Sequence, residues 1–444
     1  MTSIGVLFFA LTVSALGATK DLSIPHEKYV LEQNGLEVIL SEDHTLPIAA
    51  VNVWYHVGPL NEPEKRTGFA HLFEHLMFQG SGHVGDDQHF KLLESAGASL
   101  INGTTDYDRT NYFETVPANE LELALWLESD RMGFLLDSLT QDKLDNQRQV
   151  VMNERRQSLE NAPYGPSAEK LVPTLLPPDH PYYGYVMGSM ADLGAATLDD
   201  VRAFYTAYYA PANATLVVAG DFDTAKVKGL IGRYFGALPR RAAPAARPIL
   251  TPPVTAERRA TVKEPVTLPR VSMTWLSPPA YKEGDADADV LAMVLGGGKS
   301  SRLYRKLVYE LELAQNVSVN QESLALVSMF TVSVTGKPGV EPGKLEAEAG
   351  KLLEQIRSAP PTAREVERAR NQLQSRMVSQ LQSLGGFGGK ADMLNRYNQY
   401  VGDAGFFSRD MARYDAVTPE SVQAIAKSIL NPTARAVVTT VPEP

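Results

Sequence analysis

The stretch Val51-Asn-Val-Trp54 has apolar residues at every second position, as a β-strand with one buried face does. The stretch Val271-Ser-Met-Thr-Trp275 repeats this pattern, and the two Trp residues lie 221 positions apart. A segment that begins at Thr197 has the pattern of a helix, a turn and a strand, and the segment that begins at Thr418 repeats it at the same offset. Two separated segments with one shared offset indicate an internal duplication, so we expect two homologous domains.

Each half combines strand patterns with amphipathic helical patterns. The predicted strands of the N-terminal half cover residues 37–40, 49–54, 99–101 and 216–218. The predicted helices cover residues 68–78, 119–132, 141–159 and 198–208. Because strands are grouped with helices between them, we expect an α+β fold in which each domain has a mainly antiparallel sheet packed with helices.

A region rich in proline, alanine and arginine separates the two halves. It runs from Leu238 to Pro265, and its composition is typical of an extended connector. We therefore predict an N-terminal domain of residues 19–240, a linker of residues 241–264 and a C-terminal domain of residues 265–444.

The first 18 residues predict a secretory signal peptide. They contain an apolar run from Ile4 to Leu16 that is short for a bilayer span, and small residues at Ala15 and Gly17 offer a cleavage site. The alternative is a buried N-terminal strand, because no Lys or Arg precedes the run. From the signal peptide we expect export to the periplasm.

Composition excludes several functions. The 444-residue chain has no cysteine, which excludes disulfides and thiolate catalysis, and its formal net charge is −10. An acidic chain argues against nucleic acid and anionic membranes as partners. No stretch after the first segment is long and apolar enough to predict a membrane span.

The residues His71-Leu-Phe-Glu74-His75 predict a metal site. Positions i, i+3 and i+4 of a helix share one face, so both imidazoles can hold one ion with Glu74 beside it. Zinc favours such ligands, and the inverted His-x-x-Glu-His pattern occurs in metallopeptidases. The alternative is two ordinary histidines on an amphipathic helix. Five further histidines have no partner at ligand spacing, and we interpret them as structural or solvated: His26, His44, His56, His83 and His89.

A catalytic zinc usually has three protein ligands, so one more must come from elsewhere in the chain. The best candidate is Glu154, on a helix predicted to begin near Thr140, a favourable N-cap residue. The alternative for Glu154 is charge pairing with Arg155 or Arg156, since most helical glutamates are solvated.

Several segments, in order, resemble the pitrilysin-like zinc metallopeptidases of family M16. They are His71-Leu-Phe-Glu-His75-Leu-Met-Phe78-Gln-Gly80, Gly97-Ala-Ser-Leu-Ile-Asn102-Gly-Thr-Thr105, Val150-Val-Met-Asn-Glu154, His180-Pro-Tyr-Tyr-Gly and Gly296-Gly-Gly-Lys-Ser-Ser-Arg-Leu303. The resemblance covers nearly all of the chain after the first segment, and the length is similar to that of half-size, processing-peptidase-type subunits. It implies one half of a clamshell that a second chain completes.

Carried over position by position, the resemblance implies roles for four residues. His71, His75 and Glu154 would be the ligands of one Zn²⁺ per chain. Glu74 would be the general base of an endopeptidase that acts on peptides or unfolded protein segments.

The segment around Asn102 and Gly103 resembles the edge strand with which the family binds the main chain of peptide substrates. The alternative is an ordinary hairpin turn, because Asn-Gly is also a strong turn signal.

The chain departs from the family pattern at three positions. Gln147 stands where many members have a second glutamate, two helical turns before Glu154, so its support of the metal site would differ. Active members also have an Arg and a Tyr that approach the substrate carbonyl, and the corresponding positions here are Val308 and Gln315. We therefore expect a heterodimer with a homologous M16 subunit that carries the Arg/Tyr pair and lacks zinc ligands.

Two alternatives to a zinc endopeptidase remain open. One is a noncatalytic assembly subunit, similar to the core proteins of respiratory complexes with this fold. The other is a zinc-dependent peptide-binding protein with little turnover, which would agree with Gln147.

Overall fold

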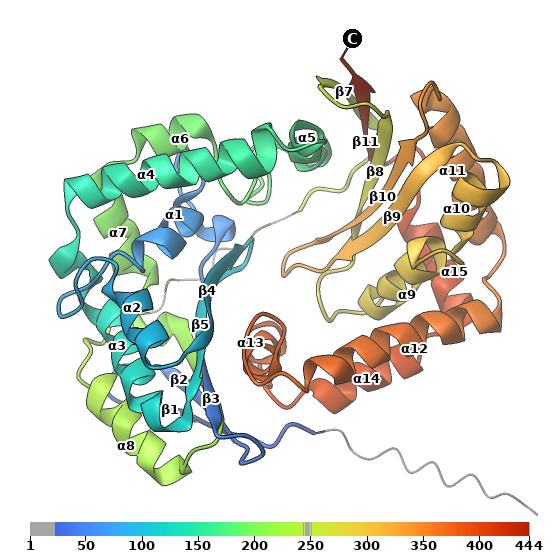
Figure 1. Cartoon of the computed structure of the whole chain (residues 1–444). Helices are drawn as coiled ribbons and strands as arrows, with labels where there is room; N and C mark the ends of the chain where they lie inside the picture. Colours follow the sequence, from blue (N-terminus) through green and yellow to red (C-terminus); the bar gives the residue numbers. More distant parts are fainter. Residues whose placement is uncertain (1–22, 243, 245–248, 250, 444) are drawn as a thin grey trace, which may run out of the picture.

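The computed structural model describes residues 23–242, 244, 249 and 251–443. The predicted signal peptide, residues 1–18, lies outside the described residues, as does part of the predicted linker. Two open sheets with helices packed against them confirm the predicted α+β class (Figure 1). The described strands form one sheet in the order β1-β2-β6-β3-β5-β4 and another in the order β7-β11-β8-β10-β9.

The elements of the N-terminal half follow one another along the chain. Its strands are β1 Glu27–Val30, β2 Glu37–Glu42, β3 Ile48–Tyr55, β4 Ser99–Asp106, β5 Arg109–Pro117 and β6 Ala214–Gly220. Its helices are α1 Phe69–Leu76, α2 Gln88–Ser95, α3 Leu121–Ser138, α4 Gln141–Arg155, α5 Gly165–Leu175, α6 Met190–Ala195, α7 Leu198–Tyr208 and α8 Thr224–Tyr234.

The C-terminal half repeats this plan. Its strands are β7 Arg258–Glu264, β8 Arg270–Ser277, β9 Ala314–Glu322, β10 Ser328–Gly336 and β11 Ala436–Pro442. Its helices are α9 Asp285–Gly296, α10 Arg302–Tyr304, α11 Pro342–Ser358, α12 Ala363–Gln380, α13 Lys390–Val401, α14 Phe407–Asp415 and α15 Pro419–Ile429.

The topology confirms the internal duplication. The order β2-β6-β3-β5-β4 in one sheet corresponds to β7-β11-β8-β10-β9 in the other. In both sheets the first of these pairs is parallel and the remaining three are antiparallel. Thr197 and Thr418, 221 positions apart, both cap their helices through a side chain that accepts the N3 backbone N–H.

The correspondence of the two Trp residues was wrong by one position. Tyr55 and Trp275 both lie in the core of their own half. Trp54 points to the opposite face of its sheet, where Nε1 donates a hydrogen bond of 3.0 Å to Asp392 Oδ1. Trp275 therefore corresponds to Tyr55. A one-residue shift reverses the face of every side chain in a strand, so a pattern match alone cannot reveal it when both faces are buried.

The predicted linker was too long. Residues 258–264, its last part, form β7, which pairs in parallel with β11 at the edge of the C-terminal sheet. Exposed Arg259, Thr261 and Lys263 alternate along β7 with the less exposed Ala260 and Val262, as in an edge strand with one solvated face.

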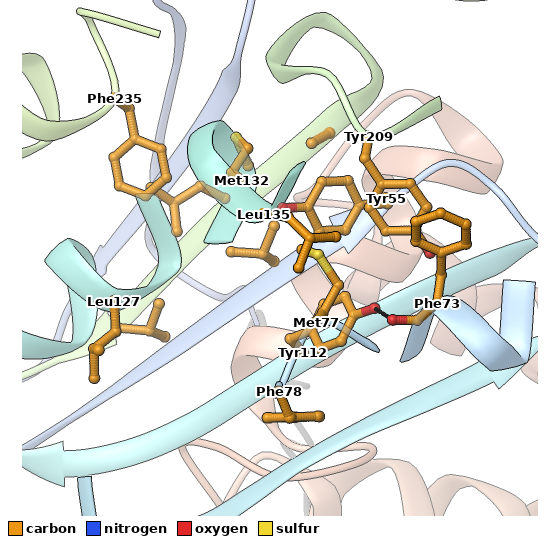
Figure 2. Packing of buried hydrophobic residues seen from close by; sticks show 14 of the residues in the cluster. Tyr55, Phe73, Met77, Phe78, Tyr112, Leu127, Met132, Leu135, Tyr209 and Phe235 are labelled. Carbon is orange, nitrogen blue, oxygen red and sulfur yellow. Dashed lines mark hydrogen bonds between the residues drawn. The ribbon is translucent and has the colours of Figure 1, made fainter. Parts of the chain in front are cut away.

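The core of the N-terminal half fixes the orientation of α1. Phe73, in the middle of α1, packs against Tyr209 with ring centroids 4.9 Å apart, and Tyr209 packs against Tyr55 at 4.7 Å (Figure 2). Tyr112 donates a hydrogen bond from its hydroxyl to the backbone oxygen of Phe73. Because this face of α1 is held in the core, the histidine face is turned away from it.

The two halves exchange helices. The helix α5, from the N-terminal half, packs on β7, β8 and β11, whereas α13, from the C-terminal half, packs on β3 and β6 (Figure 1). Ile39 and Val217 on the outer face of the N-terminal sheet share a buried cluster with Leu394 of α13. A sheet with two apolar faces needs cover on both sides, and here the other half supplies it.

Within the described part of the chain, no helix combines the length and the apolar character needed to cross a bilayer.

Candidate metal centre

Two helices from separate parts of the N-terminal half form the site. The helix α1 begins after Gly68, whose φ of +88° suits glycine, and Glu62 accepts hydrogen bonds from the backbone N–H groups of Gly68 and Ala70. The helix α4 begins after Thr140, whose side chain accepts a hydrogen bond from Lys143 N, as its N-cap role predicts. The two helices pack against each other.

The structure brings the three predicted metal ligands together. Glu154 Oε2 lies 3.1 Å from His75 Nε2 and 3.7 Å from His71 Nε2. One ligand atom from each residue lies within 4.8 Å of the others. Glu154 thus reaches across to α1 and not to Arg155 or Arg156. Arg155 pairs with Glu160 and Glu169, and Arg156 donates a hydrogen bond to Asn153 Oδ1.

The electrostatics of the site favour a cation. Burial and the neighbouring His75 lower the pKa of His71 to about 4, so its ring is neutral at pH 7 and keeps a lone pair for a metal. The hydrogen bond with His75 holds the pKa of Glu154 below its usual value, so this carboxylate is charged. The Glu154 side chain is 41% exposed, which leaves the site open to solvent.

Glu74 lies beside the three ligands and is held by the strand β4. Thr105 Oγ1 donates a hydrogen bond of 2.6 Å to Glu74 Oε2. Burial raises the pKa of Glu74, although this hydrogen bond opposes the rise. A carboxylate whose pKa moves towards neutrality is suited to accept and release a proton.

Gly103 lets β4 approach Glu74 closely. A Cβ at position 103 would lie 2.9 Å from Glu74 Cγ and 3.2 Å from a ring carbon of Phe78. Only glycine therefore fits here without moving the carboxylate.

Asn102 and Gly103 lie inside β4, not in a hairpin turn, so the turn alternative was wrong. They pair with Phe113 and Tyr112 of β5. The strand β4 is at the edge of the sheet, as the resemblance implied. Asn102 Oδ1 accepts a hydrogen bond from Gly103 N. Alternation along the strand turns Asn102 away from the Glu74 face, towards which Gly103 and Thr105 point.

The three residues that depart from the family pattern are core or surface residues of the elements in which they lie. Gln147 is buried in α4, two turns before Glu154. Val308 packs against the core of the C-terminal half, and Gln315 is exposed on β9. The helix α9, which corresponds to α1, contains no histidine.

A second group of possible ligands lies in the core of the N-terminal half. It consists of His89, Glu114 and Glu128, all buried. Glu128 is already paired with the buried Arg131, and burial together with Glu128 raises the pKa of Glu114 well above its usual value. A divalent ion would add charge to a site that Arg131 and a bound proton already balance, so we assign the metal to the first group.

Sequence reasoning missed Thr105 and the close approach at Gly103. The signal that could have found both is strand alternation, because residues 103 and 105 share one face of β4. It also missed Asp392, more than 280 residues away, which no local pattern connects to β3 or β5.

Comparisons with known proteins identify the family to which this chain is related. The family described as Insulinase (Peptidase family M16) matches residues 37–175, and Peptidase M16 inactive domain matches residues 195–373. The zinc protease PqqE of Helicobacter pylori is 31% identical over 367 residues, which cover 81% of each chain. An uncharacterised zinc protease of Streptomyces coelicolor is 26% identical over 407 residues, covering 89% of this chain and 85% of its own.

Solved structures show the same fold. A protease from Helicobacter pylori superposes with a TM-score of 0.87 at 27% identity, covering 95% of this chain and 100% of that chain. The periplasmic protease PqqL of Escherichia coli superposes with a TM-score of 0.76 at 17% identity, covering 94% of this chain and 48% of that one. The chain belongs to peptidase family M16, as its sequence motifs predicted.

Proposed function

We propose that this protein is a zinc-dependent endopeptidase that hydrolyses peptides or unfolded protein segments. The observation that carries the proposal is the convergence of His71, His75 and Glu154, with Glu74 beside them. The names of the relatives from Helicobacter pylori and Streptomyces coelicolor, both zinc proteases, support the same conclusion.

The three side chains fit one zinc ion per chain. Tetrahedral zinc with bonds of about 2.1 Å separates its ligand atoms by about 3.4 Å. The distances of 3.1 and 3.7 Å from Glu154 Oε2 to the two imidazole nitrogens lie on either side of this value. Two neutral imidazoles and one carboxylate are also the donor set of several catalytic zinc sites.

Zinc, when bound, would lower the pKa of a water molecule and polarise the scissile carbonyl group. Glu74 Oε1 or Oε2 would take the proton from this water and pass it to the leaving nitrogen. Thr105 holds the carboxylate in place for both transfers through its hydrogen bond. The edge strand β4 would position the substrate, because its outer backbone groups can pair with an extended peptide of many sequences.

We further propose that a homologous chain completes the active site. The Arg and Tyr of the family are Val308 and Gln315 here. Valine has no hydrogen-bond donor, and the neutral amide of glutamine does not supply the positive charge of the family's Arg. Loss of such a donor typically slows catalysis a hundredfold or more. The partner would carry the Arg/Tyr pair and lack the His-x-x-Glu-His motif.

A reconstitution experiment tests both proposals. The zinc-loaded chain is assayed with a quenched fluorescent peptide, alone and with the homologous chain, and metal content is measured in parallel. We expect one zinc per chain and cleavage that rises roughly a hundredfold in the mixture. Full activity of the isolated chain would remove the partner from the proposal. Zinc without cleavage in either sample would leave a peptide-binding protein, and no zinc at all would leave an assembly subunit.

Replacing Gly103 with alanine is expected to reduce turnover without removing zinc. The added Cβ meets Glu74 Cγ at 2.9 Å, and the displaced carboxylate loses its position, which costs roughly tenfold to a hundredfold in rate. Overpacking should also lower the free energy of unfolding by about 1–3 kcal/mol. The matched control is Gly229→Ala in α8, where a Cβ meets nothing within 4 Å. Equal turnover in the two variants would show that β4 does not position Glu74.

We also propose that the protein is exported to the periplasm. The apolar run from Ile4 to Leu16 supports this, as does the description of the related PqqL as periplasmic. Recovery of the full-length chain from the cytoplasmic fraction of cells would contradict it.

A further inference from the structure

Two large apolar side chains from distant parts of the chain lie exposed beside the edge strand. Phe387 is 67% exposed and Leu100, on β4, is 55% exposed. Gly386, which precedes Phe387 in the chain, lies beside Leu100: a Cβ at Gly386 would lie 3.2 Å from Leu100 Cδ1. Single exposed apolar residues are common, but two on segments that lie side by side and are 287 residues apart in sequence call for a reason.

The loop that carries Phe387 is fixed to the sheet. Gly386 and Gly388 both have a φ of +77°, which favours glycine on each side of the ring. Gly388 N donates a hydrogen bond of 2.9 Å to Asp392 Oδ2. Asp392 Oδ1 in turn accepts hydrogen bonds from Trp54 Nε1 and Asn111 Nδ2 at 3.0 and 3.2 Å. Buried hydrogen bonds therefore hold in place the loop that carries the exposed ring.

Arg109 connects this ring to the edge strand. Its guanidinium carbon lies 5.6 Å from the ring centre of Phe387 and 5.2 Å from that of Trp54. Its Nη1 donates a hydrogen bond of 2.8 Å to the backbone oxygen of Thr104 on β4. Phe387 is thereby placed along the same strand as Leu100.

The backbone of β4 is irregular at Leu100. The pairing with β5 shifts between Ser99 and Asn102, and Leu100 has a φ of +53°. This conformation is unfavourable for a non-glycine residue. The irregularity turns an apolar side chain towards Gly386, where it gains no burial within the chain.

The position of Leu100 and Phe387 indicates which kind of ligand contacts them. They lie on the face of β4 opposite to Gly103 and Thr105, which contact Glu74. Side chains of an extended peptide alternate between the two faces of a sheet that it joins. A peptide bound along β4 would direct some side chains to the metal ligands and the alternate ones to Leu100 and Phe387.

We propose that Leu100 and Phe387 form an apolar subsite for a side chain of a peptide bound along β4. The proposal deepens the proposed function and rests on it. The ligand is an extended peptide with an apolar residue, such as leucine, at a position on the opposite face from the metal ligands. The C-terminal half thus contributes to substrate selection through a loop that lies against the N-terminal sheet of the same chain.

A leucine scan tests the subsite by binding alone. Ten-residue fluorescent peptides carry one leucine, placed in turn at each position of a serine and alanine background. Their binding to the zinc-loaded Glu74→Gln protein is measured by anisotropy, together with the Leu100→Ser/Phe387→Ser double variant in the same background. We expect leucine at one position, or at alternate positions, to tighten binding about tenfold, and the double variant to lose this gain. The matched control is Val30→Ser on β1, which is 49% exposed at the opposite edge of the sheet.

The possible outcomes separate the subsite from the peptidase. An equal leucine gain in the double variant would overturn the subsite, and so would loss of association with the homologous chain without any change in peptide binding. Cleavage of the leucine-free peptide by the wild-type chain, with its partner, tests the proposed function independently. If zinc-loaded protein neither binds nor cleaves any peptide, both proposals fail together.

Discussion

The Glu74→Gln variant should keep its zinc and lose peptide cleavage by a factor of roughly 100 to 10,000. Glutamine has nearly the shape of glutamate, so it can still accept the hydrogen bond from Thr105. It cannot take a proton at neutral pH, and the attacking water would have no base. The measurement is kcat for a quenched fluorescent peptide, with zinc content determined on the same sample.

A matched substitution isolates the role of this carboxylate. Glu64 is exposed and precedes α1, so Glu64→Gln removes the same charge without touching the site. We expect this control to cleave at the wild-type rate. Undiminished cleavage by Glu74→Gln would show that another group accepts the proton. A loss of zinc in that variant would instead assign Glu74 to metal binding.

The Glu154→Ala variant is expected to lose zinc. Removal of the one anionic ligand leaves two imidazoles, and even changes in residues that only support metal ligands weaken binding by about 10- to 100-fold. We therefore expect the zinc Kd to rise by at least roughly a hundredfold, and cleavage to disappear at sub-micromolar zinc. Competition with a chromogenic chelator measures the Kd directly, so the readout does not depend on turnover.

The control for this variant lies six residues further along the chain. Glu160 is 39% exposed and pairs with Arg155, so Glu160→Ala removes a carboxylate from the same segment without changing the metal ligands. Its zinc Kd should equal that of the wild-type protein. If Glu154→Ala also retained wild-type affinity, the third ligand would have to come from another residue, and the 3.1 Å approach to His75 would be an ordinary ion pair.

The duplication shows what sequence patterns can predict and what they cannot. A shared offset identified the repeated halves, because helices with Thr N-caps and the strands after them keep their spacing. The same offset matched Trp54 to Trp275 and was wrong by one residue. Both faces of this strand are buried, one by its own helices and one by α13, so hydrophobicity could not fix the register.

The connector shows a related limit. Its composition correctly marked the boundary region between the halves, yet residues 258–264 pair with β11 near the other end of the chain. The composition of one segment does not show which distant strand it will pair with. For the same reason the exchange of α5 and α13 between the halves could not be foreseen, since each helix packs on a sheet formed by the other half.

The sequence by itself determined the α+β class, the duplicated plan and the face of α1 that carries His71, Glu74 and His75, because helical and strand periodicities are local properties. Tertiary structure decided what distant segments bring to that face. It places Glu154 at 3.1 Å from His75 and brings Gly103 close to Glu74. On the other face of β4, it places the loop of Phe387 beside Leu100. These contacts depend on how two helices and two sheets pack, and packing is a property of the whole chain that no single stretch encodes.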